Sequence, residues 1–237
     1  VLRRHLDDPA SAGNAFVYSS APARAGGLWL VGTGGVLDWL DPRTARIRHH
    51  ASAICGDLLP YVVREVRDRS VWIGCHGAVA RYDPASGALR RWDRDDTHDP
   101  APPGVVTQIV EEPDGTLWLG TPDALQLRGA DGALREVVVA GGAEGLPRGN
   151  ALQQMSRGPD GALWLATAQG LLMWNAGARR FEPVPGGPSW QVFAFGFAPD
   201  DAVWVGGSGI LVSYRWTGAE LIAERTVDAR QGLPAVA

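Results

Sequence analysis

The chain has 237 residues, a formal net charge of −4 and 45% hydrophobic residues. This composition is typical of a soluble globular protein and excludes disordered and fibrous chains. A mildly acidic chain without a basic cluster also argues against nucleic acid as the main partner. No apolar run approaches the roughly 20 residues that a membrane-spanning helix needs.

A tryptophan-centred segment recurs five times along the chain. In each copy a tight turn is followed by an apolar residue, Trp, a second apolar residue and, in most copies, a small residue. The five tryptophans are Trp29, Trp72, Trp118, Trp164 and Trp204. Successive tryptophans are 43, 46, 46 and 40 residues apart, so the repeat covers essentially the whole chain.

Each repeat also contains the signals of four short strands. Asp114-Gly115 and Asp160-Gly161 stand just before the tryptophan segment and signal a tight turn, because Gly accepts a positive φ. One short apolar strand precedes this turn, and two more follow the tryptophan segment. No stretch has a 3.6-residue periodicity long enough to predict a helix.

Four-stranded units at this spacing predict the blades of a β-propeller. The consecutive apolar residues around each Trp indicate a strand that is covered on both faces. We therefore expect the five tryptophans to anchor the packing between blades rather than to bind a ligand. A β-sandwich gives no reason for tryptophans in register, and the coils of a β-solenoid are shorter.

The expected fold is thus all-β, a β-propeller of four-stranded antiparallel blades with five blades in this chain. The blades are assigned approximately to residues 7–50, 51–95, 96–140, 141–185 and 186–230. Residues 1–6 and 231–237 are assigned to neighbouring blades, so that the chain is part of a longer protein whose ring has about seven blades. The alternative is a closed five-bladed ring in which residues 1–6 supply the closing strand.

The same segments resemble a known family. Gly-Leu-Pro before an inner strand, followed by Asp-Gly and Leu-Trp-Leu-Gly-Thr, is similar to the two-component regulator propeller repeat. The similarity covers all five repeats and is clearest at residues 115–121 and 161–167. It implies a periplasmic input domain of a membrane-anchored bacterial sensor, in which a histidine kinase or a diguanylate cyclase follows in the cytoplasm. It also implies homodimers as one arrangement of the full-length protein.

The residue types that carry catalysis or hold metals form no recognisable motif. There is no Gly-x-Ser-x-Gly nucleophile motif and no phosphate-binding loop, so we expect this chain to be non-catalytic. Cys55 and Cys75 do not have zinc-site spacing with any His, so no metal and no cofactor is expected. The sequence leaves open whether the two cysteines pair and which redox compartment holds the protein.

A ligand-binding surface at the mouth of a central channel is better supported than an active site. Positions eleven or ten residues before each Trp vary in polarity, and we expect them to face the channel. With two entry-loop residues they give the candidates Tyr18, Tyr61, Gln108, Arg148, Gln153 and Trp190. Such side chains suit a sugar, a peptide, an aromatic metabolite or a protein partner. The competing interpretation is that they only line the channel wall.

These observations favour a ligand-sensing input domain of a sensor kinase or diguanylate cyclase. One alternative is a secreted propeller enzyme similar to the streptogramin lyases, and another is a non-catalytic propeller that binds proteins. All five histidines lie within the first 98 residues, so the later blades lack the base that a lyase would need there. The sensor hypothesis is therefore preferred.

Overall fold

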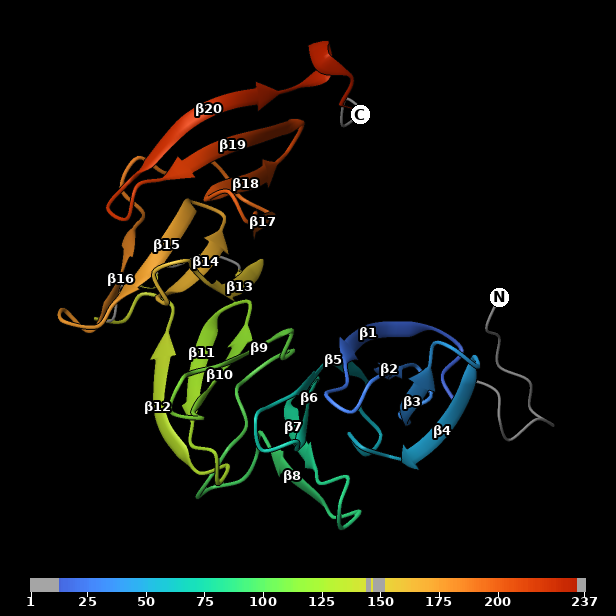
Figure 1. Ribbon diagram of the computed structural model, residues 1–237. Helices are drawn as coiled ribbons and strands as arrows, with labels where there is room; N and C mark the ends of the chain where they lie inside the picture. Colours follow the sequence, from blue (N-terminus) through green and yellow to red (C-terminus); the bar gives the residue numbers. More distant parts are fainter. Residues whose placement is uncertain (1–12, 144–145, 147–151, 234–237) are drawn as a thin grey trace. The chain divides into compact units, whose positions relative to one another are not determined.

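The computed structural model describes residues 13–143, 146 and 152–233. Within these residues twenty strands form five four-stranded sheets, and in each sheet the strands follow one another in chain order (Figure 1). A short 3-10 helix, η1 (Ala229–Gln231), follows the last strand. The prediction of an all-β protein built from five four-stranded antiparallel units is confirmed.

The first three sheets occupy the N-terminal part of the chain. The first sheet contains β1 (Val17–Pro22), β2 (Leu28–Gly32), β3 (Leu37–Asp41) and β4 (Arg46–Ala51). The second contains β5 (Pro60–Glu65), β6 (Val71–Cys75), β7 (Ala78–Tyr82) and β8 (Leu89–Asp93). The third contains β9 (Gln108–Glu111), β10 (Leu117–Thr121), β11 (Ala124–Arg128) and β12 (Leu134–Val139).

The two remaining sheets repeat this plan. The fourth contains β13 (Gln154–Arg157), β14 (Leu163–Thr167), β15 (Gly170–Asn175) and β16 (Arg180–Pro183). The fifth contains β17 (Ala194–Phe197), β18 (Ala202–Gly207), β19 (Ile210–Trp216) and β20 (Leu221–Val227). In every sheet the recurring Trp lies in the second strand.

The turn that leads into the tryptophan strand is stabilised by an aspartate in the second, third and fourth repeats. Asp114 Oδ1 accepts the backbone N–H of Thr116 at 3.0 Å, and the intervening Gly115 has a φ of 87°. Gly adopts this left-handed conformation without steric cost. Arg69 and Asp201 occupy the same turn position in the second and fifth repeats with φ values of 69° and 61°. The turn is therefore retained where the Asp-Gly sequence is lost.

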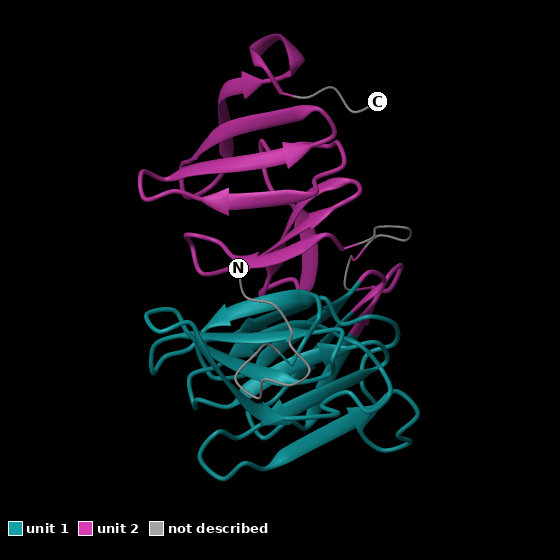
Figure 2. Ribbon diagram, turned by 90° about the vertical axis from the view of Figure 1, so that its right-hand side faces the viewer, with its two compact units in different colours: residues 1–121, 125–137 teal, residues 122–124, 138–237 magenta. Residues whose placement is uncertain are grey.

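The chain divides into two compact units (Figure 2). Unit 1 contains residues 1–121 and 125–137, and unit 2 contains residues 122–124 and 138–237. Unit 1 thus holds the first two sheets and most of the third, whereas unit 2 holds the fourth and fifth sheets.

The core of unit 1 lies between successive sheets. Trp29 of the first sheet belongs to a buried cluster with Ile73 and Tyr82 of the second. Trp72 of the second sheet belongs to a further cluster with Leu117 and Leu119 of the third. Both tryptophans are nearly inaccessible, with 4% and 1% of their surface exposed. Each therefore points from its own sheet toward the next one.

The core of unit 2 obeys the same rule. Trp164 is fully buried, and its ring contacts Phe195, Phe197 and Trp216 of the fifth sheet at centroid distances of 6.4, 5.5 and 5.0 Å. Trp204 has the same place in the fifth sheet, yet it is only partly buried. Within the described residues no later sheet is present that could cover it.

Carboxylates join neighbouring sheets at the end of the tryptophan strand. Glu65 Oε2 in the second sheet accepts the indole N–H of Trp29 at 2.7 Å and the backbone N–H of Arg24 at 3.0 Å. Glu111 Oε1 in the third sheet accepts the backbone N–H of Arg67 at 3.0 Å. The same joint thus recurs from one pair of sheets to the next.

A buried arginine fastens the loop before β9 to the third sheet. Arg128 has no exposed surface and donates to Asp99 Oδ1 at 2.9 Å, to Gln126 Oε1 at 2.7 Å and to the carbonyl of Pro100. Its guanidinium also lies 5.3 Å from the centre of the Trp92 ring. Burial lowers the pKa of Arg128, and the nearby Asp99 acts in the opposite direction.

The same substitution, Trp to Ala, tests this packing at the buried Trp164 and at the partly buried Trp204. Trp164→Ala is expected to lower the free energy of unfolding by about 3–5 kcal/mol, because it empties a closed site. Trp204→Ala is expected to cost only about 1 kcal/mol, typical of a less enclosed position. Urea unfolding followed by circular dichroism measures both, and equal costs would contradict the assignment of Trp164 as an inter-sheet anchor.

Candidate functional site

Two of the predicted ligand-binding residues form an aromatic pair. Tyr18 in β1 and Tyr61 in β5 lie on neighbouring inner strands of unit 1. Their rings are 5.6 Å apart and nearly parallel, with an interplanar angle of 6°. Tyr18 is 47% exposed, and Tyr61 is partly buried. The pair therefore presents a rigid aromatic face to solvent.

Further exposed apolar side chains stand next to this pair in the chain. Phe16 precedes Tyr18 by two residues and is 71% exposed, while Leu58 and Leu59 precede Tyr61 and are each 38% exposed. We call Phe16, Tyr18, Leu58, Leu59 and Tyr61 the Tyr18–Tyr61 surface. Exposed large apolar residues grouped in this way mark binding sites more often than isolated ones do.

The backbone on both sides of the Tyr18–Tyr61 surface is held firmly. The Phe16 N–H donates to Thr33 Oγ1 at 3.1 Å, and the Thr33 N–H donates back to the Phe16 carbonyl at 3.0 Å. On the other side the Leu59 carbonyl accepts the N–H of His76 at 3.1 Å. Both entry segments are thus tied to the end of a tryptophan strand.

A buried disulfide fixes the second of these segments. Cys55, in the connection between the first two sheets, is bonded to Cys75 at the end of β6, and both residues have no exposed surface. Their Cα atoms are 5.9 Å apart, which lies within the normal range for a disulfide. The pairing that the sequence left open is therefore present, and it lies only a few residues from Leu58, Leu59 and Tyr61.

The other predicted ligand-binding residues lie elsewhere. Gln108 begins β9 in unit 1 and is partly buried. Gln153 and Trp190 are partly buried residues of unit 2, and Trp190 packs against Gly207 at the edge of the core there. Arg148 lies outside the described residues. Tyr18 and Tyr61 are thus the two candidates that lie in ring contact.

Two side chains that stand ten residues before a repeat Trp, Ser19 and Gln154, hydrogen-bond to the backbone of the next sheet. Ser19 Oγ accepts the backbone N–H of Val63 in the next sheet at 3.2 Å. Gln154 Oε1 accepts the N–H of Phe195, and its Nε2 donates to the Phe195 carbonyl, both at 2.9 Å. These two position-ten side chains therefore join neighbouring sheets.

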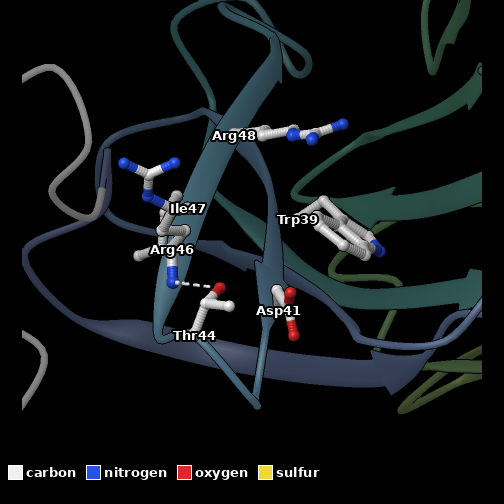
Figure 3. A pocket seen from close by; sticks show the side chains of 6 residues that line it. All are labelled: Trp39, Asp41, Thr44, Arg46, Ile47 and Arg48. Atoms are coloured by element: carbon white, nitrogen blue, oxygen red, sulfur yellow. Dashed lines mark hydrogen bonds between the residues drawn. The ribbon is translucent and has the colours of Figure 1, made fainter.

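A hollow of about 420 Å³ lies at the hairpin of β3 and β4, on the outer side of the first sheet (Figure 3). Its walls include Trp39, Asp41, Thr44, Arg46 and Arg48. The guanidinium of Arg48 lies 5.6 Å from the centre of the Trp39 ring. Hydrogen bonding from the backbone is the largest of the effects that lower the pKa of Asp41.

The indole and the carboxylate of this hollow are already engaged within the first sheet, the indole with the β1–β2 turn and the carboxylate with the β3–β4 turn. The indole N–H of Trp39 donates to the Gly26 carbonyl at 3.0 Å, and Asp41 Oδ1 accepts the N–H of Arg43 at 2.9 Å. These contacts stabilise the first sheet itself, so we assign the hollow no binding role. No motif in the sequence points to it.

Neither a metal cluster nor a membrane span is present in the described part of the chain. Within it, no group of three or more His, Cys, Asp or Glu side chains is placed to hold a metal ion. No helix there is long and apolar enough to cross a membrane.

Comparison with protein families identifies the repeat. A family model described as two component regulator propeller matches residues 100–123, from the loop before β9 to the turn after β10. The chain carries a two component regulator propeller repeat. This confirms the resemblance seen in the sequence, here in the third of its five repeats. No curated protein sequence matches the chain.

Solved structures similar to this repeat protein are themselves propellers. Virginiamycin B lyase from Staphylococcus aureus is 14% identical over 88% of this chain and 69% of the lyase, with a TM-score of 0.66. A streptogramin B lyase is 15% identical over 92% and 70% of the two chains, with a TM-score of 0.65. A chain of the mitotic checkpoint complex is 13% identical over 97% and 76%, with a TM-score of 0.66. At this identity the likeness establishes the β-propeller fold and nothing about activity.

The contribution of the disulfide to stability can be tested by replacing both cysteines, with position 75 given the residue type found in other repeats. Cys55→Ala combined with Cys75→Thr is expected to lower the free energy of unfolding by about 3 kcal/mol, because the bond closes a loop of 20 residues in the unfolded chain. Thr suits position 75 because Thr121 and Thr167 end the corresponding strands. Urea unfolding measures the change, and a stability equal to that of the oxidised parent would contradict a stabilising bond.

Proposed function

We propose that this chain is a ligand-sensing input domain of a bacterial membrane-bound signal-transduction protein, either a sensor kinase or a diguanylate cyclase. The observation that carries the proposal is the two component regulator propeller repeat at residues 100–123. The chain itself binds the stimulus and has no catalytic role. The kinase or cyclase activity belongs to another part of the full-length protein.

The Cys55–Cys75 bond supports a location outside the cytoplasm. Structural disulfides form and persist in oxidising compartments such as the bacterial periplasm and are rare in the reducing cytosol. Both cysteines are completely buried, so the bond is part of the core of unit 1. A periplasmic input domain fits this chemistry.

The Tyr18–Tyr61 surface supports a role in binding. Tyr side chains offer a large apolar face with little conformational entropy to lose, and their hydroxyl groups add hydrogen bonds at the rim. The face of a sugar ring, an aromatic metabolite or a peptide side chain can stack on such a surface. Because the entry strands on both sides are pinned, binding would act on a rigid platform rather than on a loose loop.

A secreted lyase-like enzyme is the second candidate, and the likeness to virginiamycin B lyase and streptogramin B lyase is the observation that favours it. That likeness reaches only the fold level. Metal-dependent turnover of a streptogramin by the purified chain would support the enzyme. Binding of proteins alone, without any small-molecule response, would favour a protein-interaction propeller instead.

The binding role is tested in the full-length protein by removing both rings. Tyr18→Ala with Tyr61→Ala is expected to raise the stimulus concentration for half-maximal output by about tenfold or more, the effect of losing roughly 1.4 kcal/mol of binding free energy. Output of the kinase or cyclase is measured in cells exposed to culture fractions that activate the parent. Leu89→Ala serves as the control, because Leu89 is exposed to a similar degree on the outer strand β8. An unchanged response in the double variant would refute a ligand surface at these residues.

The location is tested separately through the redox state of the cysteines. If the domain is periplasmic, Cys55 and Cys75 should resist alkylation when cells are quenched in acid and then denatured, and should react only after reduction. Cells that lack their periplasmic disulfide-forming system are the control and should show both thiols free. Free thiols in normal cells would contradict a periplasmic domain.

A further inference from the structure

A buried carboxylate in the first sheet holds a partly exposed imidazole. Asp38 in β3 is fully buried, and its Oδ1 lies 2.6 Å from Nδ1 of His49 in the paired strand β4. Its Oδ2 accepts the N–H of Gly13 at 2.9 Å and the side-chain amide of Asn14 at 3.1 Å. Both carboxylate oxygens are thus hydrogen-bonded, as burial of a charged group requires.

This arrangement selects one tautomer of His49. An ionised carboxylate can only accept hydrogen bonds, so neutral His49 carries its proton on Nδ1 and keeps a free lone pair on Nε2. The His49 side chain is 37% exposed, whereas that of Asp38 is 1% exposed. Among the described residues, no hydrogen-bond partner faces Nε2. In its neutral form the ring therefore presents an oriented acceptor at Nε2 to its surroundings.

That acceptor stands at a hollow of about 410 Å³, lined by Gly13, Val36, His49, His50, Ala51 and Ser52. Its volume lies within the usual range for small-molecule sites. Val36 and Ala51 contribute apolar wall, and the described residues around the hollow include no Asp, Glu or Arg. These described lining residues thus offer no permanently charged partner to an ionic ligand, whose desolvation they would not compensate.

The neighbouring histidine is engaged elsewhere. Nδ1 of His50 lies 3.3 Å from the hydroxyl of Tyr82, and its ring meets Trp29 edge-on at 4.8 Å. His50 therefore contacts Trp29 of its own sheet and Tyr82 of the second sheet, at a point where the pairing of β3 and β4 shifts register. Of the two histidines that line the hollow, His49 is the one whose ring is oriented by a buried carboxylate.

The Asp38–His49 pair is not a requirement of the repeat. Counting nine residues on from each later Trp gives Arg81, Leu127, Met173 and Ser213 at the position of Asp38. The other sheets thus form without a carboxylate there. Asp38 holds Gly13 and Asn14 through Oδ2 alone. The hydrogen bond between Oδ1 and His49 is therefore not needed to hold that segment.

We propose that this hollow binds a small neutral molecule that donates a hydroxyl hydrogen to Nε2 of His49 and packs its apolar edge against Val36 and Ala51. The site is separate from the Tyr18–Tyr61 surface, because His49 lies on the outermost strand of its sheet and the tyrosines lie on inner strands. The inference does not rest on the proposed sensing role.

Two matched probes test the proposal on the purified chain: cyclohexanol, which donates a hydroxyl hydrogen, and cyclohexanone, which only accepts. Nitrogen-15 NMR of the histidine rings reports both the tautomer of His49 and the binding at Nε2. We expect a proton on Nδ1, saturable shifts of Nε2 with cyclohexanol, and about fivefold weaker binding of cyclohexanone, the effect of one lost neutral hydrogen bond. His98, an exposed loop histidine, is the internal control and should not respond.

Two variants make the result specific. His49→Phe should remove the preference between the two probes. In Asp38→Asn the amide oxygen is needed by Gly13 and Asn14, so the amide N–H faces His49 and moves its proton to Nε2. The preference should then disappear, because the cyclohexanol hydroxyl and the cyclohexanone carbonyl can both accept a hydrogen bond from Nε2–H. A proton found on Nε2 of the parent protein, equal binding of the two probes, or binding of neither would each overturn the proposal.

Discussion

The packing of a tryptophan of one sheet against the following sheet, seen at Trp29, Trp72 and Trp164, is the interaction on which this structure depends. Strands of four to seven residues give sheets too small to be stable alone, so each must bury a face on a neighbour. Trp29, Trp72 and Trp164 supply that contact, each at the second strand, where the backbone is already paired on both edges. The fixed place of the Trp explains why its spacing predicts the entire strand order.

The contact beside the tryptophan indole N–H differs between pairs of neighbouring sheets. Glu65 satisfies the indole N–H of Trp29, but the corresponding residue beside Trp164 is Phe197, which gives an edge-to-face ring contact instead. The indole N–H of Trp164 then has no partner among the described residues. The backbone donor five residues before the Trp changes as well. In the first two repeats Arg24 and Arg67 donate their N–H to a glutamate of the next sheet. The third and fourth repeats have Pro113 and Pro159 at this position, and Pro has no N–H. Polar and apolar versions of one joint thus coexist in a single chain.

Periodicity in the sequence predicted the sheets, whereas features that depend on local irregularity could not be predicted from it. Spacing, turn residues and apolar runs were sufficient for five four-stranded sheets. The orientation of inner-strand side chains was not accessible, because the pairing shifts register between Val17 and Ser19 and again between Pro60 and Val62, which breaks simple alternation. Ser19 therefore turns toward the next sheet, while Tyr18 stays exposed. The Cys55–Cys75 bond was equally inaccessible, since a spacing of 20 residues does not show that the connection with Cys55 passes beside the end of β6.

Departures from the repeat gather in the first two sheets. The disulfide, the stacked tyrosines and the Asp38–His49 pair all lie there, and none has a counterpart in the described residues of the fourth or fifth sheet. Repeated residues are accounted for by packing, which every sheet needs equally. Residues that depart from the repeat need another explanation, and in these two sheets they are fixed by a covalent bond, by a stacked partner or by a buried carboxylate. Rigid presentation of exposed aromatic and imidazole groups is what a binding surface requires and what packing alone does not. Function is therefore best sought where the repeat is least regular.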